Sequence, residues 1–114
     1  MRGKIPRRFF EMMAMRFAAL ADATRLIVIH RLMNDGEQNV TRIVEATGQT
    51  HQNVSKHLRH LRHAGLVARR KDGLQVFYRL NDPVVEKLCQ LVCESLVEEF
   101  EPEEGEEDPC GNAG

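Results

Sequence analysis

The segment from Thr50 to Gly65 constrains the fold of this chain more than any other stretch of the sequence. Its only large apolar residues, Val54, Leu58 and Leu61, are spaced i, i+4 and i+7. On a helix this spacing places the three side chains in one stripe, while the other faces carry polar side chains. Thr50 is a typical N-capping residue, and Gly65 permits the backbone turn that ends a helix. The segment is therefore predicted to be a helix that packs on a core along one narrow stripe.

The same part of the chain is strongly basic, although the whole chain of 114 residues has a formal net charge of −1. Residues 49–67 contain four histidines, two arginines and one lysine, but no acid. Residues 1–81 contain 15 Lys and Arg against 6 Asp and Glu, whereas residues 82–114 contain one Lys against 11 acids. This division indicates an anionic partner for the basic part and a solvated acidic tail at the other end.

Three further helices are predicted before this segment. Apolar residues recur at helical spacing in residues 7–20, and Asp22 is a suitable N-cap for a second helix that ends in the sequence NDG. A third helix, residues 40–47, is expected to be capped by Asn39 or Thr41. Gly48 then permits a tight turn before Thr50.

After Gly65 the apolar spacing changes from helical to alternating. The sequences LVARR and LQVFYRL, joined by KDG, predict the two strands of a hairpin, and Leu74 opens the apolar face of the second strand. A last helix with Pro83 in its first turn is predicted to carry apolar residues as far as Phe100.

The predicted fold class is mainly helical with a small β-hairpin, a winged helix-turn-helix of order α-α-α-α-β-β-α. Residues 7–100 would form one folded domain, and the acidic residues 101–114 would be a disordered tail. The chain has no run of eighteen apolar residues, so no membrane contact is expected. Its odd count of three cysteines favours a reducing cytoplasm over a disulfide scaffold.

In a winged helix-turn-helix, the helix after the tight turn enters the DNA major groove. Gln52 and Asn53 each offer a donor and an acceptor to the edge of an adenine, and His51 and Arg62 also lie on the polar faces of the predicted helix. The side chains suited to phosphate are Thr50, Ser55, Lys56 and Arg59 on the helix, and Arg69, Arg70 and Lys71 at the hairpin tip. Residues 49–79 contain seven Lys and Arg against a single acid, so neutralisation of phosphates would supply much of the binding.

The sequences ALADATRLIVIHRL, NVSKHLRHLRHAGLV and RRKDGLQVFYRL resemble the ArsR/SmtB family of bacterial transcriptional repressors. The resemblance covers about residues 17–96. It implies a homodimer built through the first and last helices, which binds an imperfect inverted repeat in double-stranded DNA and leaves it when an inducer binds. Residues 7–100 would then serve both DNA binding and dimerisation. The resemblance also carries DNA contact over to residues 50–53, to Ser55, Lys56 and His57, and to the wing residues 69–71.

The chain departs from the pattern of this family at positions that bind metal. The cysteine pair that the family uses for arsenic and cadmium is replaced by the triplet Asn39-Val40-Thr41. Of the zinc-site residues of the last helix, the aspartate is present as Asp82, but the expected histidines are replaced by Val84, Ser95 and Glu98. Neither of these sites is therefore expected here.

Three cysteines remain as candidates for sensing. Cys89 and Cys93 are four residues apart on the predicted last helix, so both sulfur atoms lie on one face, and Cys110 in the tail would supply a third thiolate. Such a site would suit a soft metal ion, trivalent arsenic or oxidation. Alternatively, Cys89 and Cys93 are small buried hydrophobic residues beside a dimer interface, and Cys110 has no role.

Two functional classes are compatible with these features. The first is a sequence-specific DNA-binding repressor, and the second is a winged-helix module that contacts protein without reading a DNA sequence. Gln52, Asn53 and Lys56 at recognition positions favour the first, because protein docking does not require them. An enzyme is not expected, because there is no Gly-rich phosphate loop and because Ser55 and His57, two residues apart on a helix, do not face each other.

Overall fold

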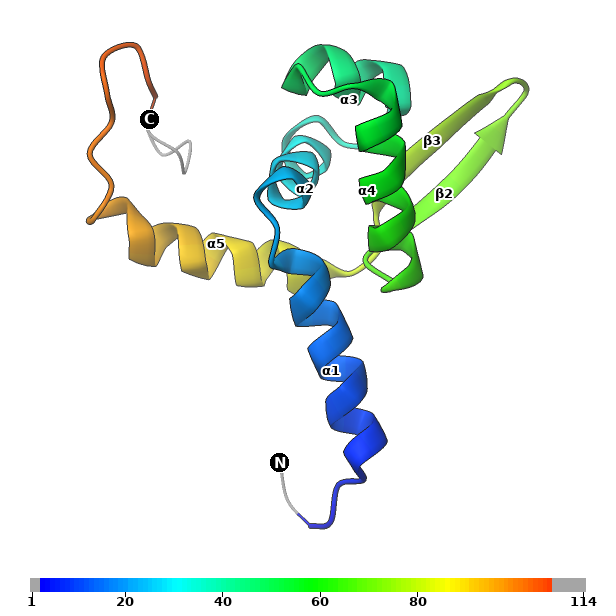
Figure 1. Ribbon diagram of the computed structural model, residues 1–114, viewed down its shortest axis with the longest axis vertical. Coiled ribbons are helices and arrows are strands. Elements are labelled where there is room, and N and C mark those ends of the chain that lie inside the picture. The colour runs from blue at the N-terminus through cyan, green and yellow to red at the C-terminus, as the bar shows by residue number, and fades with distance from the viewer. Residues whose placement is uncertain (1–2, 108–114) are drawn as a thin grey trace. The chain divides into compact units, whose positions relative to one another are not determined.

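The computed structural model describes residues 3–107, and the chain divides into two compact units, Met1–Asp82 and Pro83–Gly114. Figure 1 shows the elements of the first unit: α1 (Arg7–Leu20), α2 (Ala23–Asp35), β1 (Gln38–Asn39), α3 (Val40–Thr47), α4 (His51–His63), β2 (Val67–Asp72) and β3 (Gln75–Leu80). The second unit contains α5 (Pro83–Val97). The predicted order of five helices and a β-hairpin is confirmed.

Side-chain caps set where three of the helices begin. Asp22 Oδ1 accepts the backbone N–H of Arg25 at 3.0 Å at the start of α2. Asn39 caps α3 through the N–H of residue 42 at 2.9 Å, which decides between the two capping residues that the sequence left open. Thr50 Oγ1 accepts the N–H of Asn53 at 3.1 Å at the start of α4. Each cap satisfies a backbone donor that the first helical turn leaves without a partner.

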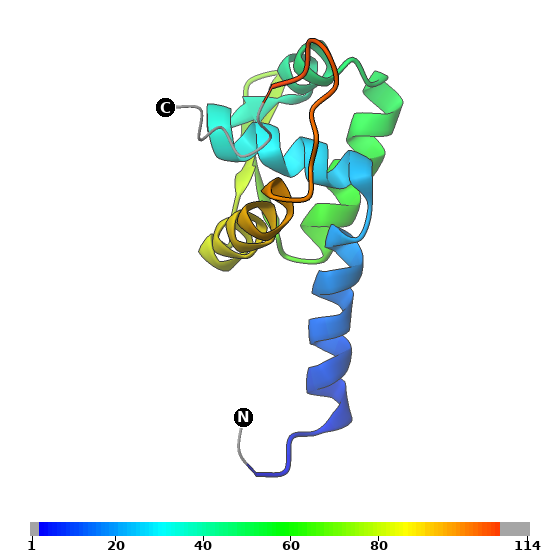
Figure 2. The same ribbon diagram turned by 90° about the vertical axis from the view of Figure 1, so that its left-hand side faces the viewer.

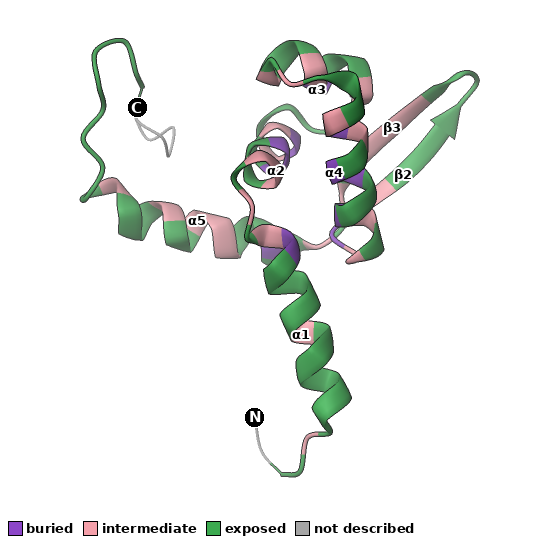
Figure 3. Cartoon of the chain, viewed as in Figure 1, coloured by how far each residue is buried: buried purple, intermediate pink, exposed green. Residues whose placement is uncertain are grey.

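The core of the first unit is formed mainly by α2, α3, α4 and the start of β2 (Figure 3). The predicted stripe of α4 is confirmed, since Val54, Leu58 and Leu61 are fully buried. The other large apolar side chains of this core, none more than 3% exposed, are Val28, Ile29, Leu32, Ile43, Leu66 and Val67.

Two glycines allow the backbone to reverse on either side of α4. Gly48 has a φ of 71° and donates its N–H to the carbonyl of Val44 at 2.9 Å, which ends α3 and begins the three-residue turn into α4. Gly65 has a φ of 80°, and the N–H of Leu66 then bonds to the carbonyl of Leu61 at 3.0 Å. Positive φ values of this kind strain any residue with a Cβ atom, so glycine is required at both turns.

The sheet has three strands in the order β1-β3-β2, all antiparallel. The sequence predicted only the hairpin of β2 and β3. It missed β1, because a two-residue strand is too short to show alternation. The prediction that Leu74 begins the second strand is wrong. Gly73, with a φ of 63°, and Leu74 form a two-residue turn, so the Leu74 side chain leaves the sheet and is fully exposed.

The second unit begins with Pro83 in the first turn of α5, as predicted. The helix ends at Val97, three residues before the expected limit at Phe100. Residues 101–107 form neither helix nor strand and are exposed, and the rest of the predicted acidic tail, residues 108–114, lies outside the described residues. No helix among residues 3–107 combines the length and the hydropathy needed to cross a bilayer.

Candidate nucleic-acid interface

The outward face of α4 carries most of the predicted DNA-contacting side chains. Thr50, His51, Gln52, Lys56 and Arg59 are exposed, and the residues that are partly exposed are Asn53, Ser55 and Arg62. This face lies opposite the buried stripe, so the apolar spacing that docks α4 on the core also turns its polar residues outward.

The two amide side chains at the start of α4 differ in their surroundings. Asn53 Nδ2 donates to Gln49 Oε1 at 2.8 Å, and Asn53 also donates its backbone N–H to the capping residue Thr50. The side chain of Gln52 makes no hydrogen bond to any described residue and is exposed. The turn therefore positions Asn53, whereas Gln52 keeps both its donor and its acceptor for an external partner.

The basic residues fall into two groups according to whether they form ion pairs. Several are paired with acids of the first unit, for example Arg16 with Asp82 at 2.9 Å and Arg31 with Asp35 at 3.8 Å. By contrast, no acid among residues 3–107 forms an ion pair with Lys56, Arg59, Arg62, Arg69 or Lys71. The cations of α4 and of the wing, the hairpin of β2 and β3, are therefore largely available for an external anion.

His57 differs from the other predicted contact residues of α4, because it is only 7% exposed. The structure does not place His57 on the exposed face of α4: position 57 falls on its buried side, between Val54 and Leu58. His57 Nδ1 lies 3.4 Å from an amino group of Arg25. A guanidinium has only donors, so in this contact Nδ1 is the acceptor and carries no proton.

The pKa of His57 is lowered, mainly by burial and further by the charge of Arg25, while Asp22 opposes the shift. The same guanidinium donates to the carbonyls of Ala19 at 2.7 Å and Ala18 at 3.2 Å, at the end of α1. His57 is thus a neutral packing residue that joins α4 to α1 and α2.

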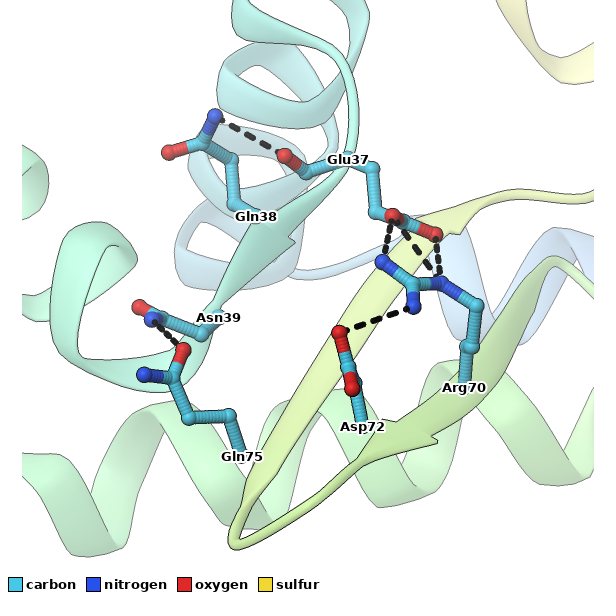
Figure 4. Close-up of polar contacts among 6 residues, drawn as sticks. All are labelled: Glu37, Gln38, Asn39, Arg70, Asp72 and Gln75. Atoms are coloured by element: carbon cyan, nitrogen blue, oxygen red, sulfur yellow. Dashed lines mark hydrogen bonds and ion pairs between the residues drawn. The ribbon is translucent and has the colours of Figure 1, made fainter.

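Arg70 on β2 is the one predicted wing cation that is paired (Figure 4). Its guanidinium donates to Glu37 Oε1 at 2.6 Å from one amino group and at 3.2 Å from Nε. A second amino group lies 3.6 Å from Asp72. The hydrogen bond from Arg70 lowers the pKa of Glu37, so this carboxyl group is ionised at neutral pH. Arg69 and Lys71, on either side, are exposed.

Two hollows on this surface bring predicted contact residues together with residues that the sequence did not single out. A hollow of about 370 Å³ lies between α1 and the outer face of α4, and Met15, Lys56 and His60 are among its lining residues. A second hollow, of about 470 Å³, connects the starts of α3 and α4 with the wing turn. Thr41, His51 and Leu74 are three residues that line this second hollow. The sequence feature that could have identified the second hollow is the N-cap Asn39. It fixes where α3 begins and so places the first turn of α3 beside the recognition helix.

The comparisons with known proteins agree with this geometry. The family described as "Bacterial regulatory protein, arsR family" matches residues 22–69. The arsenical resistance operon repressor of Escherichia coli is 35% identical over 79 residues, which cover 69% of this chain and 68% of that protein. An HTH-type transcriptional regulator of Methanocaldococcus jannaschii is 34% identical over 85 residues, covering 75% of this chain and 96% of that protein.

The chain belongs to the ArsR family. This confirms the resemblance noted in the sequence, and the family is one of transcriptional regulators rather than enzymes. The HTH-type transcriptional regulator KmtR of Mycobacterium tuberculosis is 44% identical over 72 residues, but the matched part is 63% of this chain and only 55% of that protein. The chain therefore spans about half the length of that relative.

Solved structures of ArsR-like regulators share the fold. The homodimeric winged helix-turn-helix domain of a regulator from Mycobacterium bovis has a TM-score of 0.73 at 30% identity, covering 90% of this chain and 99% of that chain. The antimony-specific repressor AntR also has a TM-score of 0.73, at 31% identity, covering 86% of this chain and 87% of that chain. The predicted winged helix-turn-helix is thus confirmed.

The cysteines proposed for sensing are not gathered into a metal site in the described part of the chain. Cys89 is half-buried, and burial raises the pKa of its thiol, which lowers the fraction of reactive thiolate at neutral pH. Cys93 is not a free thiol, and Cys110 lies outside the described residues. No three His, Cys, Asp or Glu side chains of residues 3–107 are placed to hold a metal ion.

We expect the free energy of unfolding to decrease as the pH falls from about 7 to about 5. The fold lowers the pKa of His57, mainly through burial, whereas the unfolded chain protonates this residue near its ordinary pKa of 6.5. The unfolded state therefore binds more protons in this range, so stability rises with pH. His57→Gln removes the titrating group but keeps a hydrogen-bonding side chain for Arg25, and should make the dependence shallower. Urea unfolding at several pH values measures it.

His63→Gln, which replaces an exposed histidine at the end of the same helix, is the matched control for the substitution itself. If the free energy of unfolding changes with pH in the same way in the wild type and in His57→Gln, the fold does not lower the pKa of His57.

Proposed function

We propose that this chain is a sequence-specific DNA-binding repressor that acts as a homodimer on an inverted repeat. The observation that carries the proposal is the set of exposed cations without ion pairs on α4 and the wing, in a chain of the ArsR family. The name of the E. coli relative states that it is an operon repressor. A DNA-binding role also implies a place in the cytoplasm with the chromosome.

The recognition helix supports base reading at its first turn. Gln52 and Asn53 stand at the N-terminal end of α4, the part of a recognition helix that reaches base edges. An amide side chain can form two hydrogen bonds to the edge of an adenine. In the proposed complex Lys56 and Arg59 on α4, with Arg69 and Lys71 on the wing, contact phosphates. His51 and Thr50 lie beside them at the start of the helix, and Ser55 and Arg62 lie on its flank.

The exposed apolar side chains of α1 support a dimer. In Figures 1 and 2 the N-terminal part of α1 extends away from α2, α3 and α4. The large apolar residues exposed along α1 are Phe9, Phe10, Met12, Met15 and Phe17. Leu91, Val92 and Leu96 are exposed on α5. Surfaces of this kind mark interfaces, and a two-fold dimer matches the symmetry of an inverted repeat.

The alternative function, a protein-interaction module without DNA reading, explains less of the surface. The exposed amide of Gln52 and the unpaired Lys56 have no role in docking to a protein through the acidic tail. We therefore propose residues 7–100 as the DNA-binding and dimerisation domain. Residues 101–114 lack large apolar side chains and would contribute nothing to its folding.

The effector class is suggested by relatives whose names refer to resistance to arsenic, mercury and cadmium. Among residues 3–107 the only cysteines are Cys89 and Cys93 of α5, and Cys110 is a third cysteine in the sequence. The raised pKa of Cys89 disfavours its thiolate at neutral pH, and Cys93 is not free. The burial and raised pKa of Cys89 support a packing role for this residue over arsenite or soft-metal sensing.

Binding to duplex DNA should weaken steeply with salt. With roughly six to ten phosphate contacts per dimer, affinity should fall by about three to five decades between about 50 and 200 mM salt. Lys56→Ala should weaken all sequences alike, whereas Gln52→Ala should cost about 1–3 kcal/mol and relax base choice at one position. Fluorescence anisotropy on a duplex selected from a random library measures both effects.

Lys4→Ala, which removes an exposed cation before α1, is the matched control and should leave base choice as it was. Specific binding that survives both Lys56→Ala and Gln52→Ala unchanged would exclude α4 as the recognition helix.

The free protein should be a dimer, with a mass about twice the monomer value of 13.0 kDa by light scattering. Phe17→Glu should shift it towards monomer, because it places a charge in the exposed apolar surface of α1. Glu11→Gln on the same helix is the control and should stay dimeric. A chain that ends at Phe100 should also stay dimeric, and a monomeric wild type at micromolar concentration would contradict the proposal.

Cys89→Ser/Cys93→Ser should release the selected duplex to the same extent as the wild type when arsenite or Cd²⁺ is added under reducing conditions. The reason is the low thiolate content expected for Cys89 at neutral pH. Anisotropy titrations with each ion measure the release, and Zn²⁺ serves as a harder comparison ion. Release from the wild type alone would assign sensing to these cysteines.

A further inference from the structure

We propose that Glu37 is a positioning residue of the wing, which holds Arg70 as a structural brace and keeps it out of contact with DNA. The proposal deepens, and rests on, the DNA-binding function proposed above. Arg69 and Lys71 would then be the phosphate-contacting cations of the wing. Arg70, which the sequence groups with them, would have a different role.

The guanidinium of Arg70 directs Nε and one amino group at Glu37, while its side chain remains 47% exposed. Nε lies 3.2 and 3.3 Å from the two carboxylate oxygens of Glu37, and one amino group donates at 2.6 Å. The other amino group lies 3.6 Å from Asp72. The guanidinium carbon is 4.8 Å from the centre of the Phe77 ring, within the range of a cation–π contact. A phosphate would have to displace this carboxylate pair to bind Arg70 in the same way.

Strand alternation separates Arg70 from its two basic neighbours. Arg70 is paired with Phe77 across the hairpin, whereas Arg69 is paired with Tyr78 and Lys71 with Val76. Side chains of directly paired residues share a face, and successive residues point to opposite faces. The guanidinium of Arg70 therefore lies on the opposite face of the hairpin from Arg69 and Lys71.

Glu37 connects the wing to the helix-turn-helix. It immediately precedes β1, whose residues Gln38 and Asn39 pair with Tyr78 and Phe77 of β3. Asn39 also donates from Nδ2 to Gln75 Oε1 at 3.2 Å and caps α3 through its Oδ1 (Figure 4). A strand of two residues supplies few backbone hydrogen bonds, so the Glu37–Arg70 contact adds a second attachment. The same short segment thus starts α3 and sets the direction of the hairpin.

The test compares a double variant that preserves the net charge with a variant that removes one exposed cation. Glu37→Gln/Arg70→Met removes both members of the pair and keeps the net charge, whereas Lys71→Met removes an exposed cation of the same hairpin. The dependence of affinity on salt is measured by anisotropy on a duplex selected from a random library and on a mixed-sequence duplex. Each lost phosphate contact lowers the slope of log affinity against log salt by about 0.9.

The double variant should keep the wild-type salt slope but lose preference for the selected duplex, because its wing is no longer braced. Lys71→Met should lower the slope. Glu37→Gln alone should steepen it, since the released guanidinium becomes available to phosphate. An equal loss of slope in the double variant and in Lys71→Met would assign Arg70 to the DNA and overturn the proposal.

Hydrogen exchange of the free protein tests the brace in the absence of DNA, so its result does not depend on the proposed DNA-binding function. The backbone amides of β2 and β3 should exchange faster in Glu37→Gln and in Arg70→Met, but not in Lys71→Met. The charge-swapped variant Glu37→Arg/Arg70→Glu should restore part of the protection. Unchanged exchange in the first two variants would show that no brace exists, whether or not any duplex is bound.

Discussion

The guanidinium of Arg25 is the interaction on which the arrangement of the first unit depends. It lies among the end of α1, the cap of α2 and the buried side of α4, and its side chain is 12% exposed. A buried cation must be surrounded by acceptors, because an unpaired charge in a core is costly. Here the acceptors are two carbonyls of α1, the ring of His57 and the nearby carboxylate of Asp22. A different placement of α1 or α4 would remove the carbonyl or imidazole acceptors of this charge.

Because of this packing, some basic residues stabilise the fold and others remain exposed to solvent. Some arginines stabilise the fold: Arg25 joins helices, Arg16 pairs with Asp82, and Arg70 is held by Glu37. Others, such as Lys56 and Arg59 on α4, remain exposed without an ion pair to any described acid. The net charge of −1 conceals this difference, because the acids are concentrated after residue 81. A basic surface suited to phosphate is thus compatible with a slightly acidic chain.

The start of α3 has a structural role in this chain and carries no cysteine. The residues at the start of α3 are Asn39-Val40-Thr41, which offer no thiolate, and Asn39 is engaged as the cap of α3. Its side chain also bonds to Gln75 of the wing. The position therefore has a structural role in this chain, connecting the helix-turn-helix to the hairpin. Regulation has to be sought at residues outside this triplet.

Local signals in the sequence were sufficient to predict the helices, the caps at Asp22 and Thr50, and the buried stripe of α4. Each depends on residues within about one or two helical turns of one another, so neighbouring letters contain the necessary information. The outward-facing residues of α4 followed from the same stripe. These features are what the sequence by itself determined, together with the resemblance to ArsR repressors.

Only the tertiary structure decided the remaining features, because each depends on a partner distant in the chain. His57 has a polar partner in the core because Arg25, 32 residues away, lies beside it, and Arg70 is paired because Glu37, 33 residues away, reaches it. The two-residue strand β1 exists only where β3 pairs with it. Leu74 shows the converse, since a turn of two residues removes it from the apolar alternation that the sequence displays. The sequence shows which residues are charged or polar. Whether such a group faces another residue or the solvent depends on how distant elements pack.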